Sequence, residues 1–349
     1  MGLITAEPLH TMGKKLKFKT DIATLGAPQV RSANNGEKKA KGSARGSHKG
    51  DMAHSGMVFH KGHGQHILKN PLVINAIIEK AGIKPTDIVL EIGPGTGNLT
   101  EKLLVVAKKV IAFEIDPRMV AELNKRFQQS PLQHKLEVIK GNCLDYDFPY
   151  FDKCVANVPY SISSAIVFKL LRHPTSFKCA VLMFQREFAM RICAQPGSDA
   201  YCRLSVNCQL LAKCSHLMKI SKNSFSPPPK VESSVIRLDP KHPPPPVDFE
   251  EWDGIVKMIF NRKNKKVSSI FRTKVAQLKL YDQYVSYYTM LHGGENKSGG
   301  SCMSLAGFKD MLESFLSTEE LMSRRGKSLD LEDIGVLLAK FNSHGVHFV

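Results

Sequence analysis

The stretch Asp87-Ile88-Val89-Leu90-Glu91-Ile92-Gly93-Pro94-Gly95-Thr96-Gly97-Asn98 decides the fold of this chain. Its first half is apolar and β-branched, as in a buried strand of a parallel sheet. Its second half is a glycine turn, after which Leu99, Leu103 and Leu104 mark one side of a helix. Strand, glycine turn and helix form the first crossover of a doubly wound sheet, and the glycines let backbone approach a ligand closely. The spacing is G-x-G-x-G, not the G-x-G-x-x-G of dinucleotide folds, and either pattern alone is weak.

Acidic and amide side chains follow the next two predicted strands. The run 110–114 ends at Glu114, about 20 residues beyond the glycine turn, where an acidic residue typically accepts hydrogen bonds from the ribose hydroxyls of an adenosine cofactor. The alternative is a surface helix cap, which the paired glycine turn disfavours. The run 136–140 is followed by Gly141-Asn142, at the place where an acceptor for the adenine amine would lie.

A fourth apolar run, 154–156, leads into Asn157-Val158-Pro159-Tyr160. Ligands bind just past the carboxyl ends of strands in open α/β sheets. The Asn157 side-chain oxygen and the Val158 carbonyl would accept the two hydrogens of a nucleobase amine, which is a poor nucleophile because its lone pair is delocalised. Pro159 favours an extended Val158 and so aims that carbonyl, while the Tyr160 ring would stack on a flipped base. For an isolated motif, a strand-to-helix turn capped by asparagine is the alternative interpretation.

Strands and helices continue to alternate up to an apparent hairpin formed by 216–220 and 233–238. This order predicts an α/β, Rossmann-like sheet of seven strands, as in methyltransferases. The proline run 243–246 is a stiff break and marks a domain boundary. We therefore expect a disordered basic extension over 1–57, a Rossmann-like domain over 58–242 and a smaller helical domain over 243–349.

The composition indicates a polyanionic partner. The net charge is +17 and the pI is about 9.5, which favours nucleic acid first and an acidic membrane surface second. No apolar run reaches the roughly 18 residues that a membrane helix needs, so we expect a soluble protein. The eight cysteines contain no C-x-x-C pair and no zinc spacing, which predicts free thiols in a reducing compartment and no metal site.

Three basic runs stand out. The runs 14–19 and 38–41 lie in the expected extension and would serve as a nuclear address or a loose RNA-binding arm, or merely as a solubilising tail. The run 261–266 follows a predicted amphipathic helix and is a candidate phosphate contact, with a solvated helix end as the alternative.

Taken together, the ordered motifs resemble the small-subunit ribosomal-RNA adenine dimethyltransferases, specifically their eukaryotic and archaeal branch. The resemblance runs from about residue 60 to 271 and returns at the carboxyl terminus, in 341–348. It is carried by Gly64-Gln65-His66-Ile67-Leu68, the turn 91–98, Asn157-Val158-Pro159-Tyr160, Gln185-Arg186-Glu187-Phe188-Ala189, Pro227-Pro228-Pro229-Lys230-Val231-Glu232-Ser233-Ser234 and Arg262-Lys263-Asn264-Lys265.

The resemblance implies S-adenosylmethionine as cofactor and two successive methyl transfers onto one exocyclic amine, on two adjacent adenosines near the 3′ end of small-subunit rRNA. It implies the pre-small ribosomal subunit as partner, a monomer, and the nucleolus as compartment, with the mitochondrion or cytoplasm as alternatives. It also implies that Asn157 and Tyr160 hold the target adenine, with Phe225 as a second stacking ring. The family's cofactor positions map onto His66, Leu68, Gly93, Gly95, Gly97, Glu114, Asn142 and Asn157.

The chain departs from the family pattern in three places. Asn142 stands where the family usually has Asp, and a neutral acceptor is weaker than a carboxylate by about 1 kcal/mol, so we expect reduced cofactor affinity. Val158 and Ser161 replace the more usual Leu or Ile and Gln or Asn. The segment 274–326 matches the family poorly.

Three other functions compete with this interpretation. A non-catalytic assembly or mitochondrial transcription factor of the same fold would differ by not binding cofactor. Other amine methyltransferases commonly have N-P-P-Y or D-P-P-Y and lack the blocks 64–68 and 227–234. A nicotinamide oxidoreductase would need a hydride-transfer site, and the sequence shows none.

Overall fold

The computed structural model describes residues 66–173, 177–292 and 302–348, and Val58–Val349 forms one compact unit. The expected basic extension over 1–57 lies outside the described residues. Within the described chain, no helix is long and apolar enough to cross a membrane, and no cluster of three or more ligating side chains could hold a metal ion.

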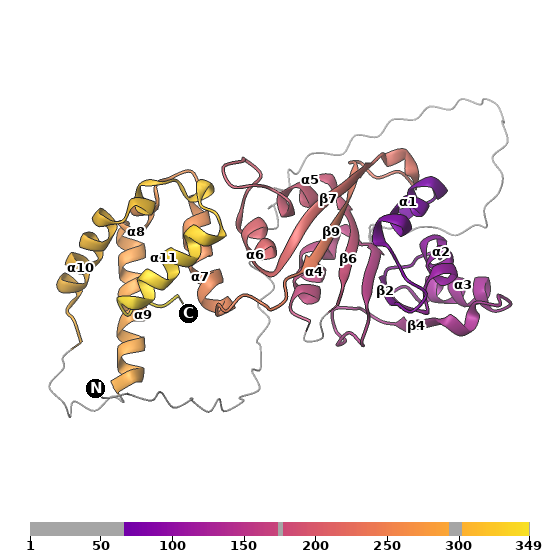
Figure 1. Cartoon of the computed structure of the whole chain (residues 1–349), viewed down its shortest axis with the longest axis horizontal. Helices are drawn as coiled ribbons and strands as arrows, with labels where there is room; N and C mark the ends of the chain where they lie inside the picture. The colour runs from indigo at the N-terminus through magenta and orange to yellow at the C-terminus, as the bar shows by residue number, and fades with distance from the viewer. Residues whose placement is uncertain (1–65, 174–176, 293–301, 349) are drawn as a thin grey trace, which may run out of the picture. The chain divides into compact units, whose positions relative to one another are not determined.

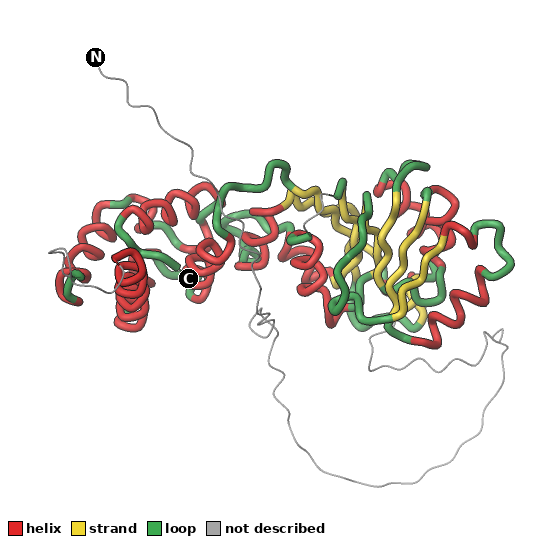
Figure 2. The backbone as a smooth tube through the Cα atoms, turned by 90° about the horizontal axis from the view of Figure 1, so that it is seen from below, coloured by secondary structure: helices red, strands yellow, loops and turns green. Residues whose placement is uncertain are grey.

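Seven strands form the central sheet; Figure 1 labels β2, β4, β6, β7 and β9, and Figure 2 draws the strands in yellow. They are β2 (Ile88–Ile92), β3 (Lys109–Glu114), β4 (Leu136–Lys140), β5 (Lys153–Asn157), β6 (Cys179–Gln185), β7 (Ala212–Ile220) and β9 (Ser233–Pro240). Their order is β4-β3-β2-β5-β6-β9-β7, with β2 to β6 parallel and β9 antiparallel to both of its neighbours. The predicted Rossmann-like, seven-stranded sheet is therefore confirmed.

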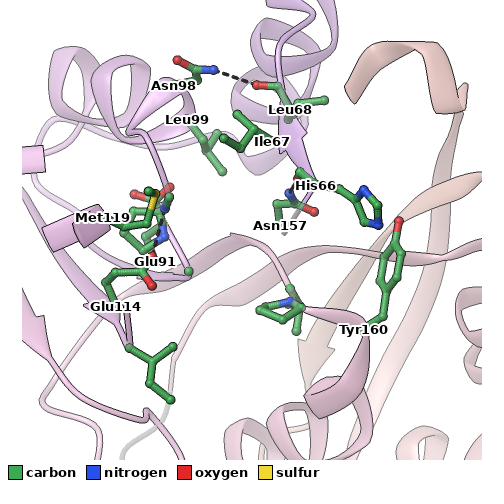
Figure 3. A pocket seen from close by; sticks show the side chains of 16 residues that line it. His66, Ile67, Leu68, Glu91, Asn98, Leu99, Glu114, Met119, Asn157 and Tyr160 are labelled. Atoms are coloured by element: carbon green, nitrogen blue, oxygen red, sulfur yellow. Dashed lines mark hydrogen bonds between the residues drawn. The ribbon is translucent and has the colours of Figure 1, made fainter. Parts of the chain in front are cut away.

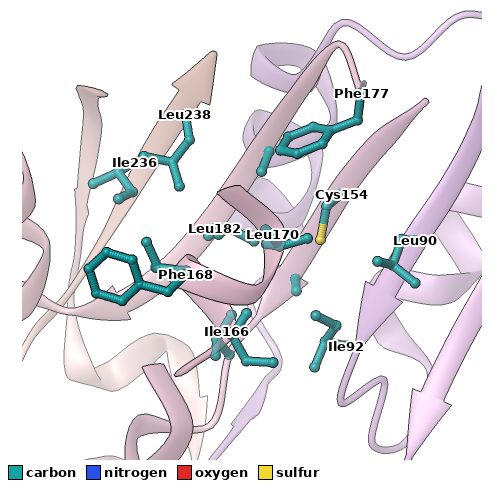
Figure 4. Close-up of a cluster of buried hydrophobic side chains, with 14 of the residues drawn as sticks. Leu90, Ile92, Cys154, Ile166, Phe168, Leu170, Phe177, Leu182, Ile236 and Leu238 are labelled. Atoms are coloured by element: carbon teal, nitrogen blue, oxygen red, sulfur yellow. The ribbon is translucent and has the colours of Figure 1, made fainter. Parts of the chain in front are cut away.

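Helices cover both faces of this sheet because its strands are apolar on both sides. Val89 packs into one core cluster and its neighbour Leu90 into the other, as the two-residue period of a strand requires. Figure 4 shows the cluster that contains Leu90. One face is covered by α1 (Pro71–Ala81), α2 (Asn98–Val106) and α3 (Pro117–Phe127), and the other by α4 (Ser163–Leu171), α5 (Arg186–Ile192) and α6 (Arg203–Leu211).

Helix α1 shows how local signals set the boundaries. The Asn70 side chain accepts a hydrogen bond from the Leu72 amide at 3.0 Å, Pro71 occupies the first turn, and Gly82 ends the helix in the left-handed conformation. These boundaries agree with the sequence. The sequence pattern also counts Leu72 with Ile74 and Ile77 on one apolar face, but Leu72 is 76% exposed, because at 3.6 residues per turn it lies on the opposite side of the helix from the buried Ile74.

The closing hairpin is longer than the sequence indicated. Strand β7 begins at Ala212, directly after α6, and therefore starts four residues before the predicted strand 216–220. A second, two-stranded sheet pairs β1 (Ile67–Leu68) with β8 (Phe225–Ser226). This pairing brings the amino-terminal end of the described chain beside the loop that precedes β9.

Helices complete the described chain: α7 (Phe249–Asn261), α8 (Val267–Phe271), α9 (Lys274–His292), α10 (Leu305–Thr318) and α11 (Leu331–Ser343). They surround a core that contains Trp252, Phe308 and Phe341. The same core includes Tyr201 and Val206, which precede the boundary predicted near residue 243. The helical part and the sheet part therefore share apolar side chains, and that boundary falls in the connection between β9 and α7.

Candidate active site

One pocket lies at the carboxyl ends of β2, β3 and β5. Because β3 and β5 flank β2 on opposite sides, the connections leave the sheet in opposite directions here, which is where open α/β sheets bind ligands. Figure 3 shows the pocket, with His66, Asn157 and Tyr160 on one side and Glu91 and Glu114 on the other. The predicted residues that line it are His66, Leu68, Gly93, Gly95, Glu114, Asn157, Val158, Pro159 and Tyr160.

The glycine turn forms the floor of the pocket in a conformation that other residues rarely adopt. Gly93 and Gly95 line the pocket with φ of 68° and 58°. Gly97, with φ of 84°, does not line it. A Cβ at Gly97 would lie 2.8 Å from Leu123 and 3.0 Å from Phe127, so this glycine lets α2 pack closely on α3. The structure gives Gly97 a packing role between α2 and α3, and the cofactor role stays a prediction.

Glu114 ends β3 and is bound by the turn. Its two carboxylate oxygens accept hydrogen bonds from the backbone N–H groups of Gly95, at 3.1 Å, and Asp116, at 2.9 Å. Burial raises the pKa of Glu114 above its usual value, and these two N–H groups oppose the shift by stabilising the charged form. Each oxygen keeps a lone pair, so the carboxylate can also accept bonds from a pair of hydroxyls.

Glu91 is a pocket residue whose role was not anticipated from the sequence. It is 1% exposed, and its Oε2 has no hydrogen-bond partner within the described chain. Burial raises the pKa of Glu91 to about 8, and the nearby charge of Glu114 adds to the shift. The available signal was an acidic residue inside an otherwise apolar strand. A cationic group in the pocket would satisfy this carboxylate.

Asn157 presents its oxygen to the pocket because its nitrogen is already bound. The Nδ2 group donates to the His66 backbone carbonyl at 3.1 Å, which fixes the amide orientation and leaves Oδ1 as the free acceptor. The next residue, Val158, has a buried side chain and donates its backbone N–H to the Met183 carbonyl. Within the described chain, no hydrogen bond is donated to the Val158 carbonyl. Two acceptors therefore stand beside each other at this edge.

Tyr160 is held by neighbours on two sides. Its hydroxyl lies 2.8 Å from the Ser233 hydroxyl, and its ring centroid lies 5.9 Å from that of His66, with the planes tilted by 35°. The His66 ring bonds through Nδ1 to the Pro227 carbonyl at 2.9 Å, so that nitrogen carries the proton. Burial raises the pKa of the Tyr160 hydroxyl, which therefore stays neutral.

Besides Gly97, two further predicted site residues, Phe225 and Asn142, do not line the pocket. Phe225 is 1% exposed, pairs with Leu68 across the β1–β8 sheet and packs in the core, so it has no free face for a base. The stacking role predicted for it is corrected accordingly. Asn142 follows β4, and its Oδ1 accepts from the Leu144 N–H at 3.2 Å. This local turn occupies one lone pair of the atom that was predicted to bind the adenine amine.

The fold and the site define a Rossmann-class protein with a ligand pocket at the carboxyl edge of its sheet, where two acceptors for an amine lie beside two buried carboxyl groups. Residues 56–286 match the model of the ribosomal RNA adenine dimethylase family. The chain is similar to a probable dimethyladenosine transferase of Drosophila melanogaster, 51% identical over 85% of this chain and 95% of the relative. It is also similar to a ribosomal RNA small subunit methyltransferase of Arabidopsis thaliana, 46% identical over 84% and 93%.

A solved structure gives the same result. The crystal structure of a dimethyladenosine transferase from Plasmodium falciparum matches with a TM-score of 0.73 and 42% identity, covering 81% of this chain and all of that one. The chain belongs to the ribosomal RNA adenine dimethylase family, and it is an rRNA adenine dimethyltransferase.

Proposed function

We propose that this enzyme uses S-adenosylmethionine to dimethylate the amines of two adjacent adenosines near the 3′ end of small-subunit rRNA. The observation that carries the chemistry is the Asn157 amide, whose orientation is set by the His66 carbonyl at 3.1 Å. The name of the Arabidopsis relative supports the small subunit as substrate. The family match supports rRNA as the partner, and we further propose that the enzyme acts as a monomer in the nucleolus.

The pocket fits the charges and hydroxyls of this cofactor. Glu91 offers a buried carboxylate, whose Oε2 has no partner within the described chain, for an α-ammonium group. Glu114, whose oxygens each accept one backbone N–H, keeps lone pairs for two ribose hydroxyls. The close approach of Gly93 and Gly95 leaves room for the rest of the molecule. When bound, S-adenosylmethionine supplies a methyl group already activated by its sulfonium.

The protein's task is then alignment and polarisation. Asn157 Oδ1 and the Val158 carbonyl would hold the two amine hydrogens, drawing the nitrogen toward a tetrahedral, nucleophilic geometry. The Tyr160 ring would stack on one face of the flipped base. No strong general base is needed, because the methylated amine releases its proton to water. The second transfer repeats the first with one hydrogen replaced by methyl, so one acceptor then suffices.

Replacing Glu114 with alanine should weaken cofactor binding by roughly 10- to 100-fold, since two charge-assisted hydrogen bonds are removed. Isothermal calorimetry with S-adenosylmethionine measures this directly. Glu137→Ala on the adjacent strand is the matched control, because Glu137 is half exposed and pairs with Lys109 away from the pocket. Equal affinities for wild type and the Glu114 variant would remove the ribose role.

A basic surface formed by two distant segments supports rRNA binding. The run 261–266 lies beside 324–327, joined by a backbone bridge between Lys266 and Arg325 and by the Lys327 N–H donating to the Lys263 carbonyl. Arg262, Lys265, Lys266 and Arg325 are exposed, and within the described residues none of them pairs with a carboxylate. The sequence indicated only the first of these segments.

The double variant Arg262→Ala/Lys265→Ala should weaken binding to pre-small subunits and reduce the slope of log K against log salt by about 0.7 to 0.9 for each phosphate that is no longer neutralised. Filter binding across a salt series measures both. Lys102→Ala/Lys125→Ala, at exposed positions of α2 and α3, controls for the loss of two positive charges. An unchanged slope would mean that this surface faces solvent in the complex.

The proposal as a whole is tested by incubating the enzyme with labelled cofactor and immature small subunits, followed by mapping of modified adenosines. We expect two neighbouring dimethyladenosines near the 3′ end. Modification elsewhere, or of the large subunit, would overturn the assignment of substrate while leaving the family unchanged.

A further inference from the structure

Ser233 is buried behind the pocket residue Tyr160, which is the one hydrogen-bond partner of its hydroxyl among the described residues. It is 0% exposed and is the first residue of β9, paired with Gln185 of β6 on one side and Ile220 of β7 on the other. Its hydroxyl lies 2.8 Å from the Tyr160 hydroxyl. A residue held between two strands is among the most rigid positions in a sheet, so Ser233 provides a fixed anchor point.

Tyr160 needs such an anchor more than the rest of its loop does. Its backbone begins a short 3₁₀ turn, and its carbonyl accepts from the Ser163 hydroxyl at 3.1 Å, so the near end of the residue is fixed by α4. The ring can still turn about its two side-chain torsions. The contact with Ser233 fixes the far end of the ring, and the His66 ring limits movement on one side.

We propose that Ser233 is a positioning residue for methyl transfer: its hydroxyl fixes the plane of the Tyr160 ring and thereby the place where the target adenine stacks. This inference rests on the proposed role of Tyr160 as the stacking ring. A base that stacks on a tilted ring would carry its amine away from Asn157, and small misplacements of reacting groups cost large factors in rate. Loss of this contact would leave binding of the cofactor and of the rRNA backbone unchanged.

The chain offers a matched control in the next residue. Ser234 is also 0% exposed and lies on the same strand, but its side chain points to the opposite face of the sheet, and its hydroxyl has no partner within the described chain. Ser233→Ala and Ser234→Ala therefore remove the same atom from equally buried sites, and only the first removes the contact with Tyr160.

The test is a double-mutant cycle on methyl transfer to pre-small subunits, with single-turnover and steady-state kinetics. We expect Ser233→Ala to lower kcat roughly tenfold, with KM for the subunit and the Kd for S-adenosylmethionine within about twofold of wild type. Tyr160→Phe should cause a similar loss, and the double variant should be no slower than either single variant. Ser234→Ala should leave kcat unchanged.

The inference would be overturned by a wild-type kcat in Ser233→Ala, or by an equal loss of kcat in Ser234→Ala. It would also be overturned if Ser233→Ala lowered kcat as much in the Tyr160→Phe background as it does in wild type. If Ser233→Ala does not fold, Tyr160→Phe alone tests the contact from its other side, and a wild-type kcat there rejects it. Tyr160→Ala distinguishes failure of the stacking proposal from failure of the Ser233 proposal. Normal methyl transfer without the ring would contradict stacking by Tyr160. A large loss in Tyr160→Ala together with a normal rate in Ser233→Ala would contradict only the role of Ser233.

Discussion

Asn157→Ala should lower methyl transfer by at least roughly a thousandfold while changing the affinity for S-adenosylmethionine by only a few-fold. Among the described residues, the amide makes one hydrogen bond, from Nδ2 to the His66 carbonyl, which leaves its oxygen for the pocket. Loss of that oxygen removes an acceptor that polarises the amine and also fixes its position. Removal of one preorganised polar group from a catalytic site typically costs about 10²- to 10³-fold, and the loss of alignment adds to this.

Single-turnover transfer to pre-small subunits and calorimetric cofactor binding together measure the two quantities. Asn124→Ala, an exposed amide on α3, is the control for removal of an asparagine side chain and should behave as wild type. Methylation at the normal rate by the Asn157 variant would show that the amine is held elsewhere. A parallel collapse of cofactor binding would show instead that the amide serves the cofactor rather than the base.

The positions of the main elements could be predicted because local signals and sheet periodicity agree. The apolar runs 110–114, 136–140 and 154–156 set strand boundaries by burial, and the structure reproduces them within a residue or two. Parallel strands bring their carboxyl ends to one edge, so Glu114 and Asn157 could be placed together although 43 residues separate them.

The parts that escaped prediction depend on contacts between distant segments. Phe225 was assigned by likeness of motif, but the pairing of β8 with β1 turns its ring into the core, and nothing local in the loop encodes that pairing. In the sequence, Glu91 is only one residue of a predicted strand. The structure shows that it is buried near Glu114 and that its Oε2 has no hydrogen-bond partner within the described chain. The contacts of Tyr160 with Ser233 and His66 likewise join three segments that are separate in the sequence.

Glu91→Gln should stabilise the free enzyme at neutral pH and weaken cofactor binding. The pKa of Glu91 rises from 4.5 to about 8 on folding, chiefly through burial. A folded-state pKa above the unfolded value means that the folded protein holds the proton more tightly. The contribution of Glu91 to the free energy of unfolding is therefore fully present below about pH 4.5 and is lost as the pH rises toward 8.

The size of this effect follows from the linkage relation. Each pH unit between the two pKa values lowers the free energy of unfolding by about 1.4 kcal/mol, which amounts to about 3 kcal/mol at pH 7. Glutamine has no proton to lose. Urea unfolding of both proteins at about pH 5.5 and 7.5 should therefore show a difference between them that grows by about 2.5 kcal/mol over that interval. A difference that stays constant with pH would place the Glu91 carboxyl in contact with water.

Cofactor binding should be coupled to the protonation of Glu91, because a cation can bind Glu91 fully only when the carboxyl has lost its proton. At about pH 7, wild type should release about one proton on binding S-adenosylmethionine, and calorimetry in two buffers of different ionisation enthalpy measures this number. Glu91→Gln should release none and bind more weakly by roughly tenfold or more. Equal proton release from both proteins would assign the α-ammonium to another group.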